Sequence, residues 1–236
     1  MRAIDFSCAT HTGLVRELNE DAYLSAPDLK LWAVADGMGG YEAGEVASAI
    51  VVGELALRID GNAGLAQAIR HCHQAIVDAV ARGEGAPEMG STVVAVLFDE
   101  SHYQVAWVGD SRAYLWNGAE LRQLTRDHSY VQLLLAAGLI EATEMATHPS
   151  RNVILQALGV GGPDGAPLQV DVVRDEWEDG DTLLLCSDGL SGAVPDVAIA
   201  AILRAERNNK VRSERLIAAA LENGGKDNIT VVVLST

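Results

Sequence analysis

Six short apolar runs limit the folds that this chain can adopt. Each has the length of a β-strand and is rich in Val, Leu, Trp or Phe, with turn residues on both sides. The runs are residues 31–35, 92–98, 103–108, 113–116, 182–186 and 229–234. Only turn-sized gaps, 99–102 and 109–112, separate the second, third and fourth runs. Because these gaps leave no room for crossover helices, the three strands are expected to be antiparallel.

Five further segments carry apolar residues at helical spacing. They are residues 45–59, 65–80, 129–137, 197–205 and 213–221. The first two are consecutive and predict a helical hairpin that lies on a sheet. Strands interleaved with paired helices favour a layered α+β fold over a βαβ repeat. The sequence DGMGGYEAGE lacks the glycine spacing of a dinucleotide-binding loop and the lysine of a phosphate-binding loop, which disfavours a doubly wound nucleotide-binding fold.

The length of 236 residues is that of one domain with a sizeable hydrophobic core. No low-complexity tract, regular repeat or linker-like stretch divides the chain, so we expect a single domain over residues 1–236. Hydrophobic residues make up 49% of the chain and charged residues 21%, which excludes a disordered protein.

The charge of the chain excludes several kinds of partner. There are 33 Asp and Glu against 17 Lys and Arg, which gives a net charge of −16. Nucleic-acid binding and polybasic attachment to a membrane both need a basic surface. No apolar run approaches the roughly 20 residues that span a bilayer. The N-terminus has no signal-peptide pattern, and Cys8, Cys72 and Cys186 have no metal-site spacing, so we expect a cytoplasmic protein with free thiols.

Four aspartates stand where a predicted strand ends or is about to begin. Asp36 follows LWAVA, Asp110 follows VAWVG, Asp188 follows LLLCS, and Asp227 precedes the last strand by two residues. Three of them adjoin a glycine, which permits a sharp turn. Short carboxylate side chains at strand ends suit Mg²⁺ or Mn²⁺, which prefer oxygen ligands. Asp-Gly is also an ordinary turn signal, so a metal cluster and simple turns both remain open at this point.

A further acidic pair, Glu20 and Asp21, lies in the sequence RELNEDAY together with Arg16. By itself this segment is typical of a solvated charged surface. Beside a metal cluster, the planar guanidinium of Arg16 would be suited to hold a phosphate through two hydrogen bonds.

Eight motifs in order identify a family that the chain resembles. They are RELNEDA (16–22), VADGMGGYEAGEVAS (34–48), MGSTVV (89–94), VGDSRAYL (108–115), LTRDHS (124–129), RNVILQALG (151–159), LLCSDGL (184–190) and KDNITVVV (226–233). The chain resembles the metal-dependent protein phosphatases of the PPM family, the type 2C serine/threonine phosphatases, in their compact bacterial form. The resemblance implies a four-layer αββα sandwich of two antiparallel sheets flanked by helix pairs. It also implies a flap that shapes substrate access, here at about 129–165.

The resemblance further implies a binuclear Mn²⁺ or Mg²⁺ centre at one edge of the sandwich. Asp36 would bridge the two ions and the Gly37 carbonyl would bind one of them. Asp188 and Asp227 would bind the other ion. Glu20 would hold metal-bound water.

The remaining implied site residues surround this centre. Asp21 would be a neighbour of Glu20 among the metal ligands, and Asp110 with Asp188 would hold a third, weaker metal. Arg16 matches the residue that contacts the substrate phosphate. The expected catalytic residues are Arg16, Asp36 and Asp188.

The mechanism that the resemblance implies uses water as the nucleophile. Two cations lower the pKa of a bridging water, and the resulting hydroxide attacks phosphorus in line without a covalent enzyme intermediate. The expected activity is hydrolysis of phosphoserine and phosphothreonine on proteins, by a monomer that reverses a bacterial Ser/Thr kinase.

One departure from the family pattern concerns the proton donor to the leaving group. Many eukaryotic relatives carry histidine at the position of Met38. The remaining candidates are a metal-bound water, His128 and His148, although a lone histidine is more often structural.

Other classes of function remain open. A pseudoenzyme would bind a kinase or phosphoprotein without hydrolysis, but the retained Asp36, Asp188 and Asp227 disfavour it. A simple cation-binding or interaction module is disfavoured by Arg16 and by the ordered motifs. Within the enzyme class, a regulator acting on a sigma-factor antagonist pathway is a further alternative.

Overall fold

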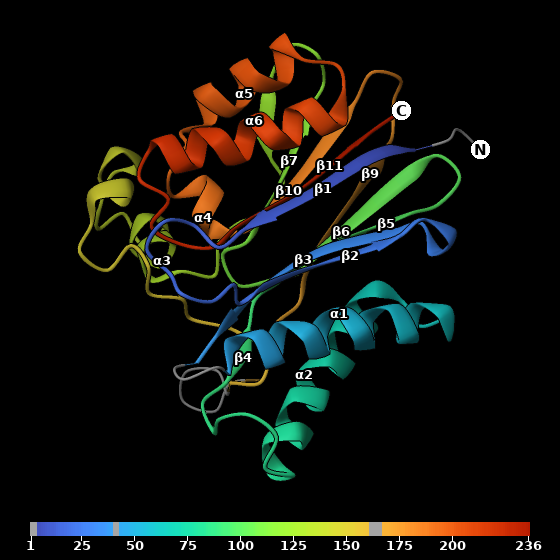
Figure 1. Cartoon of the computed structure of the whole chain (residues 1–236), viewed down its shortest axis with the longest axis vertical. Helices are drawn as coiled ribbons and strands as arrows, with labels where there is room; N and C mark the ends of the chain where they lie inside the picture. The colour runs from blue at the N-terminus through green and yellow to red at the C-terminus, as the bar shows by residue number, and fades with distance from the viewer. Residues whose placement is uncertain (1–3, 40–42, 161–166) are drawn as a thin grey trace.

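Two antiparallel β-sheets lie face to face in the computed structural model, which describes residues 4–39, 43–160 and 167–236 (Figure 1). The five-stranded sheet has the order β1-β11-β10-β7-β8, and the six-stranded sheet has the order β2-β3-β5-β6-β9 with β4 paired to β3. The first sheet contains β1 (Asp5–His11), β7 (Arg112–Trp116), β8 (Leu121–Gln123), β10 (Thr182–Cys186) and β11 (Ile229–Ser235). The second contains β2 (Asp21–Ala26), β3 (Leu31–Met38), β4 (Gly90–Ser91), β5 (Val93–Phe98), β6 (His102–Val108) and β9 (Asp171–Glu176).

Helices cover the outer face of each sheet. Figure 1 shows helices on both sides of the sandwich. The six-stranded sheet is covered by α1 (Gly44–Asp60) and α2 (Leu65–Ala81). The five-stranded sheet is covered by α4 (Asp188–Ser191), α5 (Asp196–Ala205) and α6 (Asn209–Glu222). The remaining short helices are the 3₁₀ turn η1 (Pro27–Leu29) and, in the flap, α3 (Tyr130–Ala136) and the 3₁₀ segment η2 (Ala142–Thr147).

Three hydrophobic cores hold these four layers together, and strand alternation explains them. In β3, Leu31 and Ala33 pack with α1 and α2, whereas Trp32 and Val34 pack against the other sheet. The strands β10 and β11 divide their residues in the same way between the helices and the space between the sheets. Because the inner strands are buried on both faces, they read as continuous apolar runs. All six predicted strand runs and all five predicted helical segments are confirmed.

The expected arrangement of the three neighbouring strands is only partly correct. β5 and β6 pair antiparallel, but β7 lies in the other sheet, between β10 and β8. The gap after β6 therefore carries the chain from one sheet to the other. Gly109 has a φ of 105° in this gap, and a Cβ there would lie 2.7 Å from the Cβ of Thr92. A glycine is needed because both the backbone angle and the space exclude a side chain.

Two other expectations concern the chain as a whole. Cys8, Cys72 and Cys186 are free thiols, as predicted. Among the residues described above, no helix is both long enough and apolar enough to cross a membrane. Residues 40–42 of the motif at 34–48 lie outside the described residues.

Candidate metal centre

Five aspartates from five separate segments meet at one end of the sandwich. Asp21 begins β2, Asp36 lies in β3, Asp110 follows β6, Asp188 begins α4 and Asp227 precedes β11. Burial raises the pKa of Asp36 well above its usual range, and the negative charges of the other four raise it further. The structure thus brings together all the aspartates that the sequence singled out.

Glycines beside two of these aspartates serve close packing of the backbone. β3 continues through Gly37, so Asp36 lies within the strand and not after its end. A Cβ at Gly37 would lie 2.0 Å from the carbonyl oxygen of Gly44, and a Cβ at Gly189 would lie 1.9 Å from that of Asn228. The expectation of sharp turns is wrong at these two glycines, because tertiary contacts hold one in a strand and the other in a helix.

Asp21 has one carboxylate oxygen without a partner. Ser187 donates its hydroxyl to Oδ2 across 2.8 Å, whereas the buried Oδ1 accepts no hydrogen bond from any described residue. Burial, and then the charges of Asp188 and Asp227, raise the pKa of Asp21 to about 7. A proton or a cation would complete the coordination of this oxygen.

Asp110 and Asp188 are subject to the same repulsion. Burial and then the charge of Asp188 raise the pKa of Asp110 to about 8. Burial and then the charge of Asp227 raise the pKa of Asp188 to about 6. Asp127 also lies near Asp110, but its own carboxylate accepts a 2.7 Å hydrogen bond from Nη2 of Arg112.

Hydroxyl groups fix the backbone at Asp36. The Asp36 N–H donates to Oγ1 of Thr92 across 3.1 Å, and its carbonyl accepts from Oγ of Ser91 across 3.1 Å. Oγ1 of Thr92 also lies 2.7 Å from Oγ of Ser111, which begins the approach to β7. The hydroxyls of Ser91, Thr92 and Ser111 thus link the two sheets around Asp36. A nucleophilic serine or threonine of a catalytic triad would be hydrogen-bonded to a histidine, and within the described residues none of these three is.

Asn228 holds the segment that carries Glu20, and sequence reasoning missed it. Its Oδ1 accepts the Glu20 N–H across 2.8 Å, and its Nδ2 donates to the carbonyls of Thr12 and Leu18, both across 2.8 Å. The carboxylate of Glu20 lies against the start of α1, where a Cβ at Gly44 would be 2.4 Å from Oε1. The available signal was the place of Asn228 inside the motif at 226–233.

Arg16 lies at the exposed edge of the aspartate cluster. Its Nη2 donates to Oδ2 of Asp227 across 2.8 Å, and the two side chains are 49% and 36% exposed. The hydrogen bond to Asp227 raises the pKa of Arg16, and the charges of Glu20 and Asp188 contribute. The positively charged guanidinium of Arg16 therefore lies on the solvent side of the carboxylates, where it would attract an incoming anion.

His128 and His148 are engaged in other contacts. Nδ1 of His128 accepts the Gly109 N–H across 3.2 Å, and its Nε2 lies 3.5 Å from Oδ2 of Asp171. Nδ1 of His148 accepts the Ser150 N–H across 3.1 Å. These contacts favour a structural role for both histidines over proton donation at the cluster.

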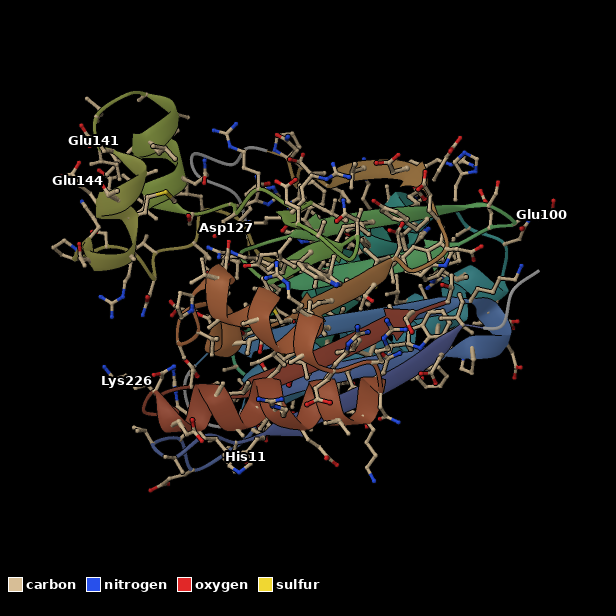
Figure 2. The ribbon with its side chains drawn as sticks, turned by 90° about the horizontal axis from the view of Figure 1, so that it is seen from above. His11, Glu100, Asp127, Glu141, Glu144 and Lys226 are labelled. Carbon is tan, nitrogen blue, oxygen red and sulfur yellow. The ribbon has the colours of Figure 1, made fainter. Side chains whose placement is uncertain are left out.

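The flap projects from the sandwich as a separate lobe. Figure 2 shows Glu141 on this lobe, at the same end of the molecule as Lys226. The Tyr130 N–H donates to the Val153 carbonyl across 2.8 Å, which ties the start of the flap to a later part of it. Residues 161–165 of the predicted flap lie outside the described residues.

The donor atoms of the cluster suit a metal ion better than their present orientation does. As the side chains stand, the described residues contain no group of three or more His, Cys, Asp or Glu arranged to hold one ion. Asp21 and Asp227 are instead turned toward Ser187 and Arg16. The chemistry of the donors still fits a hard divalent cation, because they are mutually repelling carboxylates and Oδ1 of Asp21 has no partner. Metal binding would require these side chains to turn from their present partners.

Comparison with known proteins places this geometry in a family. The family model described as Protein phosphatase 2C matches residues 5–133. The serine/threonine phosphatase stp of Listeria monocytogenes (strain EGD-e) is 36% identical over 243 residues, which cover 95% of this chain and 93% of that protein. The chain belongs to the protein phosphatase 2C family. The resemblance carried by the eight motifs is thereby confirmed.

A mycobacterial relative and its solved structures agree with this family membership. The serine/threonine protein phosphatase PstP of Mycobacterium tuberculosis (strain H37Rv) is 38% identical over 234 residues. The match covers 97% of this chain but 44% of PstP, so the chain spans less than half of that relative. The crystal structure of the M. tuberculosis phosphatase PstP/Ppp has a TM-score of 0.90 and 38% identity, with 98% of each chain covered. A PstP catalytic domain in complex with two manganese ions has a TM-score of 0.86 and 36% identity, with 98% of this chain and 97% of that one covered. These likenesses confirm the predicted αββα sandwich of the protein phosphatase 2C family.

Proposed function

We propose that this chain is a metal-dependent phosphatase that removes phosphate from phosphoserine and phosphothreonine on proteins. The observation that carries the proposal is the cluster of five aspartates with Arg16 at its exposed edge. Membership of the protein phosphatase 2C family and relatives named as serine/threonine phosphatases support the same activity.

Two Mn²⁺ or Mg²⁺ ions are the proposed cofactors. Asp36 would contact both ions and the Gly37 carbonyl one of them, while Asp188 and Asp227 would hold the other. The two manganese ions in the homologous PstP structure support this number. The raised pKa values of Asp36 and Asp188 support cation binding at this place, because cations would relieve the repulsion between the carboxylates.

Three further carboxylates would lie around the two proposed ions: Glu20, Asp21 and Asp110. Glu20 would hold metal-bound water with Asp21 as its neighbour, and Asn228 fixes the Glu20 backbone. Asp110, together with Asp188, would provide a third and weaker position, and the charge of Asp188, which raises the pKa of Asp110, supports their proximity.

The residues of the chain would bind and orient the substrate. Bound divalent cations supply a water of lowered pKa and offset charge on phosphoryl oxygens. Arg16 would leave Asp227 and direct its planar guanidinium to two oxygens of the phosphate. Ser91 and Thr92 would keep Asp36 in register by holding its backbone on both sides.

Residues 1–236 would form one catalytic domain, with the flap at about 129–165 shaping access to the site. The partners would be a Ser/Thr kinase and its phosphorylated substrates, with the phosphatase acting as a cytoplasmic monomer. Neither nucleic acid nor a membrane is a proposed partner, in keeping with the net charge of −16.

Release of phosphate from a phosphothreonine peptide tests the proposal. We expect turnover with Mn²⁺ or Mg²⁺ and none after chelation. Asp36→Asn provides the matched inactive variant, since it keeps the size of the side chain while removing its charge. Folded protein that binds the peptide but shows no turnover with any divalent cation would establish a pseudoenzyme instead.

A further inference from the structure

A cavity of about 390 Å³ lies at the end of the five-stranded sheet opposite the aspartate cluster. Its walls come from the turn after β7, the start of β10, the loop between α5 and α6, and the end of β11. Asp188 follows β10 and Asp227 precedes β11, whereas Thr182 and Ser235 at the other ends of these strands line the cavity. At about 3.3 Å per residue, the seven residues of β11 place the cavity roughly 20 Å from the cluster. Figure 1 shows β10 and β11 between α4 at one end and the C-terminus at the other.

Three arginines line this cavity in an otherwise acidic protein. They are Arg204, Arg207 and Arg212. The segment 204–215, RAERNNKVRSER, carries five basic and two acidic residues in a chain of net charge −16. A local excess of positive charge in this setting marks a surface that attracts anions.

The two acidic side chains that line the cavity, Asp181 and Glu206, have other partners. Oδ2 of Asp181 accepts the Glu178 N–H across 3.1 Å. Oε1 of Glu206 pairs with Nη1 of Arg215 across 2.5 Å. Neither forms an ion pair with the lining arginines in the part of the chain that the structure describes.

Arg212 is a buried cation held only by neutral oxygens. It is 7% exposed, and it donates to the carbonyls of Glu206 and Leu203, to Oγ1 of Thr182 and to Oδ1 of Asn209. The two carbonyls belong to the end of α5, whose dipole offsets part of the charge. A guanidinium has five N–H groups, so one remains after these four hydrogen bonds. Burial, and then the charge of Arg207, lower the pKa of Arg212, and the charges of Asp5 and Glu206 offset this only in part.

The other two arginines stand at the opening. Arg207 is exposed and forms no hydrogen bond or ion pair with any described residue. Arg204 packs over the ring of Trp116 at 5.4 Å and donates to the Ala119 carbonyl across 3.3 Å, which limits its motion. One free and two pre-positioned guanidinium groups therefore surround a single volume.

We propose that this cavity binds a small organic anion through a phosphate or carboxylate group. Arg207 and the remaining N–H of Arg212 would hold the anionic group, and Arg204 would flank it. Planar guanidinium groups match the oxygens of both head groups in two-point hydrogen bonding. The volume is within the ~300–1,000 Å³ of small-molecule sites, which leaves room for an organic body beyond the head group. Binding here is independent of the phosphatase activity proposed above.

Nuclear magnetic resonance of the ¹⁵N-labelled, Mg²⁺-loaded full chain tests this site. The probes are phenylphosphonate, which has no hydrolysable ester, and phthalate, which carries carboxylates instead. We expect saturable shifts at the Gly118 and Gly180 amides, which line the cavity, with a dissociation constant of about 1 mM or lower. A response to one probe alone identifies the head group, and a response to both assigns the site to either group.

Two arginine variants test whether the anion binds in this cavity. Arg207→Gln should weaken binding about tenfold, because it removes a charge-assisted contact. The control is Arg70→Gln, which removes an exposed arginine on α2 and should leave the affinity unchanged. The spectra also report whether each variant is folded.

Two results would overturn the proposal. One is the absence of shifts at Gly118 and Gly180 at about 10 mM of either probe, ten times the expected constant. The other is equal binding by the Arg207→Gln variant. Shifts confined to Gly13 and Gly225, beside the aspartate cluster, would likewise reject the cavity while leaving the phosphatase proposal intact.

Discussion

Asp21 lies directly opposite Asp36 in the antiparallel pairing of β2 with β3. Like charges at opposed positions destabilise a pair of strands, and burial strengthens the effect here. The register of the backbone therefore forces two carboxyl groups together. The folded protein must offset this repulsion with protons or with cations.

The metal-free protein is expected to lose stability as pH rises from about 4 to about 8. The pKa values of about 6, 7 and 8 for Asp188, Asp21 and Asp110 exceed the ordinary value of 3.8. The folded state thus binds more protons than the unfolded state over this range, so the free energy of unfolding falls as pH rises. Calorimetry in a chelator measures this fall, and a loss of ~2 kcal/mol would lower the Tm by roughly 4–8 °C. Added Mn²⁺ should restore the Tm most strongly at the upper end of the range.

The Asp21→Asn variant separates this cause from general effects of pH. Asparagine keeps an oxygen for the Ser187 hydroxyl and removes one of the opposed charges. The metal-free variant should have a higher Tm than the parent near pH 8 and a flatter dependence on pH. A parent Tm that stays constant or rises between pH 4 and pH 8 would contradict the assignment of these carboxyl pKa values.

Asp188→Ala should abolish turnover while the fold is retained. We expect a fall in kcat of roughly 100-fold or more, the scale seen when an electrostatic group is removed from an active site. Asp196→Ala is the matched control, because Asp196 also begins a helix but its carboxylate accepts a hydrogen bond from the Tyr114 hydroxyl across 3.2 Å. Phosphate release and circular dichroism provide the two readouts. Full activity of Asp188→Ala would show that the ligand assignment is wrong.

Arg16→Ala should weaken the action on substrate without weakening metal binding. Loss of a charge-assisted contact of about 1.5–3 kcal/mol predicts a decrease in kcat/KM of roughly 10–100-fold. Mn²⁺ affinity should not fall, because the variant releases Asp227 from its ion pair. Arg16→Lys keeps the charge but not the two-point geometry and should be intermediate. Calorimetric titration that shows lost Mn²⁺ affinity with unchanged kcat/KM would give Arg16 a structural role instead.

His128 is expected to stabilise the crossover between the sheets through its Nδ1 atom. His128→Ala leaves the Gly109 N–H without its acceptor and should cost about 1–3 kcal/mol in the free energy of unfolding. Asparagine places an oxygen near the position of Nδ1, whereas glutamine places one near Nε2, so His128→Asn should be the more stable of the two. Urea unfolding ranks the three variants, and equal stability of all three with the parent would remove this role.

The inner and outer strands differ in how well the sequence revealed them. β3, β10 and β11 are buried on both faces and appear as apolar runs. β2 and β9 were not predicted, because their sequences, DAYLSA and DVVRDE, combine half-buried and exposed positions at the edges of the six-stranded sheet. An edge strand has little apolar signal of its own, and the neighbouring strand determines its place.

The sequence by itself determined the chemistry that this protein has available. The order of the motifs identified the family, and the carboxylates of Asp36, Asp188 and Asp227 predicted a hard divalent cation. Only the tertiary structure decided that Asp21 faces Asp36 and that Asn228 holds the Glu20 backbone from 208 residues away. Short-range patterns report the burial and conformation of one segment, whereas these relationships depend on the packing of segments that are far apart in the chain.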